Sequence, residues 1–291
     1  MTIKLYTHYD QLKNDALGEA FRRFPDKVPE GNFFQTGEFF KFIGEVPGYQ
    51  PFLLVAGNGL GAVSGSLLGV FQSNGGGVKS WLSRRLIVWG GPLLLENSPA
   101  EKQQLARKLL DEMLKHAQGN AIFVEFRNFF DTSHLHGVFE AAGFQYKPHL
   151  NYLVKTDEAA AVKKRMSSNR TRQIKSSLKL GATIAEPASE QEVLDFYRIL
   201  QKLYKEKVKK PLPDINLFLK FWQSDIEKIF LVRYEGRVVG GIACPIYRDK
   251  VIYEWYVCGE DGLEKNLHPS VLATWAPIEY GLEHGFAHFD F

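Results

Sequence analysis

The stretch Tyr253–Trp275, YEWYVCGEDGLEKNLHPSVLATW, contains three different patterns in succession. An alternating apolar segment is followed by a charged loop with a glycine, and then by an apolar run with helical spacing. Pro269 stands where this helix would begin, a position that suits proline because its fixed φ matches the first turn. The stretch therefore predicts a strand, a loop and a helix whose first amides point into the loop.

The order of elements around this stretch is predicted twice. In both halves of the chain two strands joined by a tight turn are followed by a third strand, a helix and a last strand. The segments are 52–71, 85–95, 100–116 and 121–128 in the first half, and 230–247, 251–259, 269–283 and the segment from Phe286 in the second. This repeat predicts an α+β protein with two related domains, which we place at residues 1–156 and 157–291.

Composition restricts the class of protein. Of the 291 residues, 45% are hydrophobic and 24% charged, which is ordinary for a globular protein. No apolar run approaches the roughly 20 residues that span a bilayer, and the chain does not begin with an apolar signal region. Cys244 and Cys258 lie in separate predicted strands, and their spacing is not that of a metal site, so we expect both to be reduced thiols. We therefore expect a cytoplasmic protein without a metal site.

Positive charge is concentrated in residues 163–210. They contain 13 Lys and Arg against 5 Asp and Glu, so this zone carries +8 while the rest of the chain carries −5. Such a zone favours a polyanionic partner, although a solvated helix surface has the same composition. Arg165, Arg170 and Lys175 are the candidates for anion contacts, with surface or interdomain salt bridges as the alternative. In a continuous helix, Arg170 would lie beside an apolar stripe.

The helices of this part of the chain have recognisable ends. The basic segment is predicted to be helical throughout or in two pieces, with Ser168 or Asn169 as a possible cap of the second piece. Gly181 predicts its end, and Ser189 with Glu192 predicts a capping box at the start of the next helix. Asp214 predicts the cap of a further helix. The predicted strand 143–157 would be the last strand of the first domain.

The order of strands and helices resembles the Gcn5-related N-acyltransferase (GNAT) fold, present twice, with mixed central sheets flanked by helices. In ordinary members, the helix after the fourth strand begins with a glycine-rich segment whose amides hold the pyrophosphate of coenzyme A. The equivalent stretch here, GLEKNLHPSVLATW, lacks those glycines, and Pro269 removes an amide. In place of backbone amides, this loop has side chains such as Lys265 that could contact a ligand. We therefore expect a donor or acceptor other than coenzyme A.

Nearly the whole chain resembles the FemABX-like aminoacyltransferases, which build peptidoglycan bridges. The resemblance rests on the tandem domains, the basic helical pair and the stretches NFFQTGEFFKF (32–42), VWGGPLLL (88–95), VEFRNFFD (124–131), GFQYKPHLNYLV (143–154) and KNLHPSVLATWAPIEYGLEHGFAHFDF (265–291). It implies transfer of an aminoacyl group from aminoacyl-tRNA, as co-substrate, to the amine of a UDP- or lipid-linked muropeptide precursor. No resident cofactor is implied. Family members usually continue past the Asp-Phe at the end of this sequence. Either a further C-terminal segment follows in the natural protein, or the protein is shorter than its relatives.

Several candidate residues lie near the reaction cleft of this fold. Glu254 and Tyr256 are candidates to accept the proton of the attacking amine. Strand alternation would place both on one face and put Trp255 on the other face with Tyr253, a candidate for substrate binding. Glu254 could instead pair with a neighbouring strand. His268 is a candidate base, with a cap or hydrogen-bond role in its loop as the alternative. Asp290 is expected to orient a ligand or to cap the next turn.

Arg127 is a substrate-binding candidate in the first half, because ligand groups often project from strand ends. Pairing with Glu125 is the alternative for its guanidinium group.

Two other functions remain open on the sequence. One is an acyltransferase that uses coenzyme A or an acyl carrier protein on a small amine, and the other is a non-catalytic relative that binds an anionic precursor. An aminoacyl ester is already activated, so positioning and oxyanion stabilisation are sufficient chemistry. The sequence contains no Ser-His-Asp, Cys-His, metal-ligand or Walker-type motif. It does not predict an oligomeric state.

Overall fold

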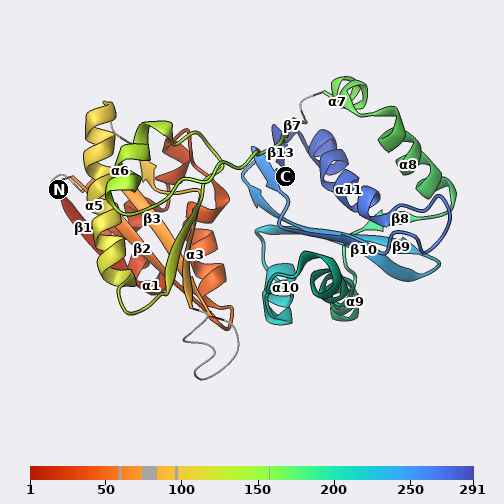
Figure 1. Cartoon of the computed structure of the whole chain (residues 1–291), viewed down its shortest axis with the longest axis horizontal. Helices are drawn as coiled ribbons and strands as arrows, with labels where there is room; N and C mark the ends of the chain where they lie inside the picture. The colour runs from red at the N-terminus through yellow and green to blue at the C-terminus, as the bar shows by residue number, and fades with distance from the viewer. Residues whose placement is uncertain (59–60, 74–83, 96–97, 157) are drawn as a thin grey trace. The chain divides into compact units, whose positions relative to one another are not determined.

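The chain forms two compact units, Met1–His149 and Leu150–Phe291. The computed structural model describes residues 1–58, 61–73, 84–95, 98–156 and 158–291. Each unit contains one mixed sheet with helices on both faces (Figure 1), as the sequence predicted. In the described residues, none of the helices is long and apolar enough to cross a membrane.

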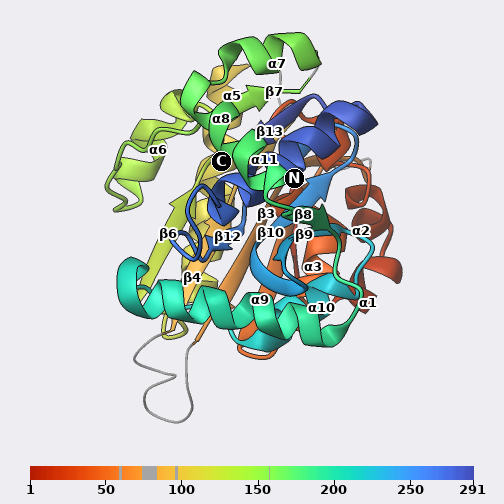
Figure 2. The same ribbon diagram turned by 90° about the vertical axis from the view of Figure 1, so that its right-hand side faces the viewer.

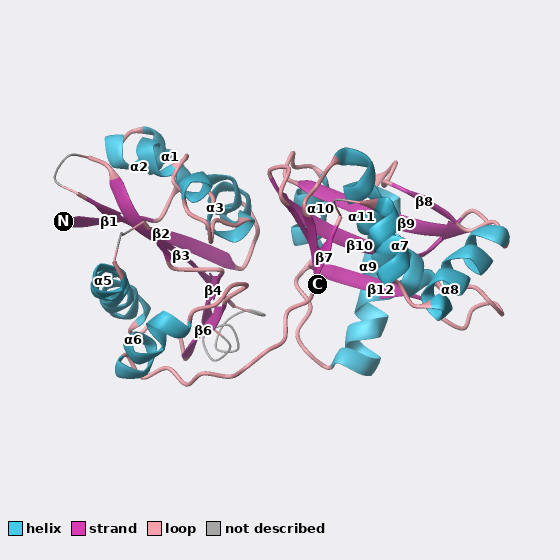
Figure 3. Cartoon of the chain, turned by 90° about the horizontal axis from the view of Figure 1, so that it is seen from above, coloured by secondary structure: helices cyan, strands magenta, loops and turns pink. Residues whose placement is uncertain are grey.

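The first unit is built on a sheet with the strand order β1-β2-β3-β4-β6, and β5 also pairs with β3. The strands are β1 (Thr2–Tyr6), β2 (Tyr49–Gly57), β3 (Val63–Gln72), β4 (Arg85–Trp89), β5 (Leu93–Leu94) and β6 (Phe123–Arg127). One face carries α1 (Tyr9–Lys13), α2 (Ala16–Phe21) and α3 (Gly37–Gly44), and the other carries α5 (Pro99–Ala117) and α6 (His136–Ala141) (Figure 3). Short helical turns lie at η1 (Pro25–Lys27), η2 (Phe33–Gln35) and η3 (Ser133–Leu135).

Helix α5 shows how local sequence directs the packing of this unit. Ser98 and Glu101 form a capping box and Pro99 occupies the first turn, so the start of the helix is strongly defined. Its apolar stripe, which includes Leu105 and Leu109, is buried against inward-facing residues of β2 and β3. Gly65 of β3 allows the close approach, because a Cβ there would lie 2.9 Å from a methyl group of Leu105.

The second unit is built on the strand order β7-β13-β11-β10-β9-β8, and β12 also pairs with β10. The strands are β7 (Leu153–Lys155), β8 (Thr183–Ala185), β9 (Glu227–Tyr234), β10 (Arg237–Tyr247), β11 (Val251–Tyr253), β12 (Tyr256–Gly259) and β13 (His288–Asp290). Helices α7 (Ala159–Arg165), α8 (Ser168–Lys179) and α11 (Pro269–His284) lie on one face of the sheet. Helix α9 (Glu190–Leu203), its π-helical continuation η4 (Tyr204–Val208) and α10 (Ile215–Trp222) lie on the other (Figure 2).

The predicted repeat is present in the two sheets. In each unit a long antiparallel hairpin, β2–β3 or β9–β10, is followed by a strand that runs parallel to the strand after the main helix. The turn of the second hairpin has Glu235 and Gly236 at positive φ, which tight hairpin turns require. The helix ends at Gly181 and Asp214 are also as predicted, since Gly181 has positive φ and Asp214 caps α10.

The strand expected to end the first domain belongs to the second sheet. β7 pairs antiparallel with β13, with Leu153 opposite Asp290 and Lys155 opposite His288. The division between the units therefore falls after His149, rather than after residue 156 as we expected. A short apolar strand carries no local signal for its partner, which is decided by the sheet edge that it meets in the folded chain.

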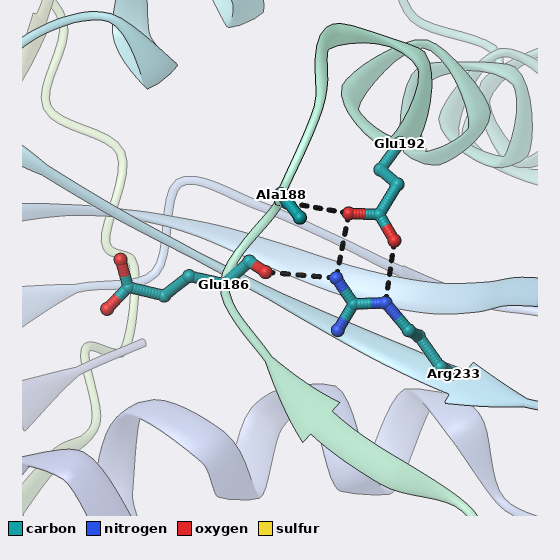
Figure 4. A network of polar contacts seen from close by, with 4 residues as sticks. All are labelled: Glu186, Ala188, Glu192 and Arg233. Atoms are coloured by element: carbon teal, nitrogen blue, oxygen red, sulfur yellow. Dashed lines mark hydrogen bonds and ion pairs between the residues drawn. The ribbon is translucent and has the colours of Figure 1, made fainter.

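The basic helical segment forms two helices, which is one of the two arrangements that the sequence left open. The break lies between Arg165 and Ser168, and the cap of α8 is Ser167, which accepts a hydrogen bond from the Arg170 N–H, rather than Ser168 or Asn169. The predicted capping box at α9 is not formed, because the Ser189 side chain makes no cap hydrogen bond. Glu192 instead pairs with Arg233 of β9 and accepts a hydrogen bond from the Ala188 N–H (Figure 4).

Candidate functional site

A β-bulge interrupts the strand that was predicted over residues 251–259. Its two parts, β11 and β12, both pair with β10. Between Ile252, which pairs with Ile246, and Tyr256, which pairs with Ala243, this strand has one residue more than β10 has. The Trp255 N–H donates to the carbonyl oxygen of Ala243 at 3.0 Å, so Trp255 and Tyr256 both oppose Ala243. Bulges redirect side chains and are common beside active sites. This one lies where the pairing of β11 with β13 ends.

The bulge changes which face of the sheet the aromatic residues occupy. The Trp255 ring lies 5.3 Å from that of Phe221, and the Tyr256 ring lies 5.0 Å from that of Phe218, both on α10. The prediction that alternation separates Trp255 from Tyr256 is therefore wrong. Strict alternation holds only for regular pairing, and an extra residue brings two consecutive side chains to one side.

Glu254 directly precedes the bulge and has unusual surroundings for a carboxylate. Its N–H donates to the Asp290 carbonyl oxygen at 2.7 Å, which makes it the last residue bonded across to β13. The side chain is half-buried, and its Oε2 is buried without a hydrogen-bond partner among the described residues. Burial raises the pKa of Glu254 to about 7. Its carboxyl group therefore titrates where a general base for an amine is most effective.

Asp290 lies on the neighbouring strand. It is opposite Tyr253 in the parallel β11–β13 pair, and both side chains are buried, at 5% and 6% exposure. Burial raises the pKa of Asp290 to about 6, and a hydrogen bond with Asn151 partly opposes this shift. Two carboxyl groups whose pKa values are raised by burial thus lie on adjacent strands, at the point where the pairing ends. Perturbed pKa values of this kind are typical of functional sites.

A side chain of the protein itself occupies the start of α11. The Asp261 carboxylate accepts a hydrogen bond from the Ser270 N–H at 3.1 Å and another from the Ser270 hydroxyl. The backbone of β12 also packs closely there, since a Cβ on Gly259 would lie 2.3 Å from the Ser270 nitrogen. A helix start is an anion site, and here the anion is Asp261. This arrangement agrees with the expectation that the stretch is no cradle for a pyrophosphate.

The loop before α11 is tied to α8. The Ser176 hydroxyl donates to the Asn266 carbonyl oxygen at 2.9 Å, and the His268 N–H donates to the Ser177 hydroxyl at 2.9 Å. Lys265 is exposed in this loop. The start of α11 meets β12 at Gly259, which lies roughly 15 Å along the strand from Glu254. The His268 N–H is bound to α8, in line with the hydrogen-bond role that the sequence left open for this residue.

The basic candidates on α7 and α8 have different surroundings. All three are exposed. The Arg165 guanidinium donates to the Lys155 carbonyl oxygen at 2.8 Å, and that of Arg170 donates to the Gln173 side chain at 2.9 Å. Lys175 instead lines a groove of about 630 Å³ with Lys163, Arg172 and Lys179. Because the helix is broken before Ser168, Arg170 does not continue the apolar stripe of α7.

The first unit has a similar interruption between two strands, but no carboxylate at the position that corresponds to Glu254. β4 and β5 both pair with β3 and are separated by residues 90–92, as β11 and β12 are separated at the bulge. The Gly90 N–H donates to the Arg127 carbonyl oxygen at 2.8 Å, the counterpart of the bond between Glu254 and Asp290. The Arg127 side chain pairs with Glu125 at 2.8 Å, which is the alternative that the sequence left open. The carboxylate candidate for proton transfer is therefore on the second repeat.

Sequence reasoning missed Asp261 and three of the cations that line the groove. Asp261 lies nine residues before the Ser270 N–H that it accepts from, too far for a capping pattern to reveal. Lys163, Arg172 and Lys179 belong to the predicted basic zone. Only the break between α7 and α8 decides that these cations, together with Lys175, share one groove.

Comparison with known proteins supports the predicted fold. No protein-family model matches the sequence, and no curated protein matches it. Among solved structures, FemX is similar at a TM-score of 0.69 and 13% identity, covering 100% of this chain and 88% of FemX. A tandem GNAT protein from the clavulanic acid biosynthesis pathway is similar at 0.58 and 10% identity, covering 99% and 89% of the two chains. L-PGS from Bacillus licheniformis is similar at 0.55 and 16% identity, covering 94% and 74%.

The chain thus has the fold of tandem GNAT proteins, with one GNAT-like sheet in each unit. FemX shares this architecture over the whole of the chain. The predicted resemblance to the FemABX-like group is confirmed for the architecture.

Proposed function

We propose that this protein is an N-acyltransferase in which Glu254 accepts the proton of the attacking amine. The observation that carries the proposal is the buried Oε2 of Glu254, which has no partner among the described residues and lies at the bulge. A carboxylate with a pKa of about 7 is ionised in a large fraction of molecules at neutral pH and still binds a proton well. Tyr256 follows two residues later and is a second candidate for a proton contact.

The proposed reaction needs little beyond positioning and proton transfer. The amine nitrogen attacks the acyl carbon of the ester, a C–N bond forms, and the C–O bond of the ester breaks. The proton from the amine passes to Glu254, directly or through water, and then to the leaving oxygen. Holding amine and ester in contact supplies most of the acceleration, at effective molarities of about 10⁵ M or more.

The substrates that we propose are aminoacyl-tRNA as donor and a UDP- or lipid-linked peptidoglycan precursor as acceptor, both met in the cytoplasm. The likeness to FemX supports this choice. The Asp261 carboxylate at the start of α11 also supports it, because a pyrophosphate at that position would meet a negative charge. Tyr253, Asp290 and Lys265 remain candidates for contacts with these substrates.

A transfer assay with several donors tests the proposal. Purified protein is incubated with a UDP-linked muropeptide and either total aminoacyl-tRNA or acetyl-coenzyme A, and the product mass is measured. We expect an aminoacylated muropeptide, and we expect Glu254→Gln to lower kcat/KM by about 10²- to 10⁴-fold. Glu283→Gln, which neutralises an exposed carboxylate on α11, is the matched control and should leave activity unchanged.

Three results would contradict the proposal. An acetylated product would assign the protein to the coenzyme A acyltransferases. Binding of the muropeptide without any product would make it a non-catalytic relative. Full activity of Glu254→Gln would remove Glu254 from the reaction.

A further inference from the structure

The surface of the α7–α8 pair holds an unusual concentration of positive charge. Residues 159–181 contain seven Lys or Arg and no Asp or Glu. Four of these cations, Lys163, Arg172, Lys175 and Lys179, are exposed and line one groove together with the hydroxyl-bearing residues Ser168 and Thr171. We call this set the basic groove. Among the described residues, no carboxylate lines it.

Helix α8 is held firmly by its opposite side. Ile174 is only 9% exposed and packs in the core with residues of α11, and Ser177 is completely buried. The Ser177 hydroxyl donates to the Gln173 carbonyl oxygen at 2.8 Å and accepts from the His268 N–H. The cations of α8 are therefore displayed from a helix with a fixed orientation, next to α7 (Figure 2). Because the helix is already ordered, binding of a ligand does not have to order its backbone.

The spacing of the cations indicates the kind of anion. Arg172, Lys175 and Lys179 follow one another at three and four residues, which corresponds to roughly 4.5 and 6 Å along a helix axis. Lys163 extends the array across the break to α7. An isolated diphosphate would contact only part of such a line, whereas a nucleic acid strand presents phosphates in succession.

We infer that the basic groove binds the phosphate backbone of an RNA strand, namely the body of the tRNA donor. This inference rests on the proposed function and adds the surface on which the donor lies. Of the three candidates chosen from the sequence, Lys175 lines the groove, whereas Arg165 and Arg170 lie outside it.

Binding of deacylated tRNA at several salt concentrations tests the inference. The groove variant is Arg172→Ala/Lys175→Ala/Lys179→Ala. The control variant Lys102→Ala/Arg107→Ala/Lys108→Ala removes the same charges from α5. Alanine favours both helices, so neither variant should disturb the fold. For the groove variant we expect Kd to rise about tenfold or more and the slope of log K against log salt to fall by about 2 to 3. The control should keep the slope of the unmodified protein.

Equal losses in the two variants would overturn the inference, because they would reflect net charge alone. It would also be overturned if tRNA binding stayed intact while binding of anionic phospholipid vesicles or of the UDP-linked muropeptide was lost.

A donor without the tRNA body separates this inference from the proposed function. Transfer from a 3′-aminoacyl-adenosine should be equal in the groove variant and the unmodified protein, while transfer from aminoacyl-tRNA should be reduced only in the variant. Absence of transfer from either donor, with groove-dependent tRNA binding retained, would contradict the proposed function and leave the basic groove as an RNA site. Equal loss of both transfers in the variant would contradict the groove assignment.

Discussion

At the residue scale, burial determines the proton affinity of Glu254. The carboxyl group is half-buried and its Oε2 has no partner among the described residues, so the charged form loses solvation without compensation. Its pKa is raised to about 7. The sequence identified Glu254 as a candidate from its place on the strand. It could not predict this burial, which depends on the bulge.

The pH dependence of transfer should report the ionisation of Glu254. Only the carboxylate accepts a proton, so kcat/KM should rise as the pH increases through about 7 and then level off. Glu254→Gln should lose this rise, and Glu283→Gln should keep it. Initial rates with a fixed acceptor across the pH range measure both effects. If Glu254→Gln kept the same midpoint, another group would be the base.

Stability should have the opposite dependence on pH. Because the folded-state pKa of Glu254 is raised from 4.5 to about 7, the native protein binds more protons than the unfolded chain between these values, and its stability falls as the pH rises. Glu254→Gln cannot lose stability in this way. The change in the free energy of unfolding that this substitution causes should therefore be about 1 to 3 kcal/mol more favourable at about pH 8 than at about pH 4, a range that is discounted for partial exposure. Thermal unfolding of the unmodified protein and the variant measures the difference. A stabilisation that is the same at both pH values would show that the carboxyl group is not perturbed.

At the scale of elements, one ion pair connects a helix to the sheet of the second unit. Arg233 of β9 donates to both carboxylate oxygens of Glu192 on α9, at 2.7 and 2.8 Å, and to the Glu186 carbonyl oxygen at 3.0 Å (Figure 4). Both charged side chains are about four-fifths buried, with 19% and 23% exposed. The hydrogen bonds from Arg233 lower the pKa of Glu192. A paired arrangement of this kind is stronger than an exposed salt bridge.

Breaking this pair should destabilise the protein measurably. Glu192→Gln should lower the free energy of unfolding by about 1 to 3 kcal/mol at neutral pH, because Arg233 keeps its charge without its anionic partner. Asp195→Asn is the matched control, since its pair with Arg198 is more exposed, and it should cost less than about 0.5 kcal/mol. Denaturant unfolding measures both changes. Equal costs would show that burial adds nothing to this pair.

The same pair has a definite pH dependence. The folded-state pKa of Glu192 is lowered, so its stabilisation is present above the unfolded-state value and is lost as the pH falls through the folded-state pKa. The cost of Glu192→Gln should therefore shrink at acid pH.

At the scale of the whole molecule, the chain consists of two units with separate cores. The core of the first unit includes Phe52 and Leu109, and that of the second includes Ile242 and Leu272. The segment between Gly143 and Tyr152 contains no helix or strand. Leu150 is 83% exposed, and Tyr146 and Tyr152 are 62% and 64% exposed.

Limited proteolysis should cut the chain in this segment first. Chymotrypsin cleaves after large apolar and aromatic residues, and Tyr146, Leu150 and Tyr152 are the accessible sites there. We expect two resistant fragments, one ending and one beginning between residues 146 and 153, identified by intact mass. A first cut within the sheet of either unit would contradict the structural division.

Local sequence patterns are sufficient to specify the element types and their order. Periodicity of apolar residues, the proline at the start of α11, the glycine after α8 and the cap at Asp214 all act within a few residues, so they can be read locally. From them followed the two α+β repeats. The expected GNAT-like architecture and the choice of Glu254 as a candidate came from the resemblance of this order of elements to a known fold.

The contacts between distant groups, in contrast, are specified by the folded chain as a whole. In the folded chain β7 pairs within the second sheet, and Glu192 pairs with Arg233. Asp261 accepts a hydrogen bond at the start of α11, and four cations line the basic groove. The bulge puts Trp255 and Tyr256 on one face. Each of these features depends on a hydrogen-bond or packing partner supplied by a remote part of the chain. Local sequence constrains backbone conformation, but it does not specify which remote partner satisfies a given polar group.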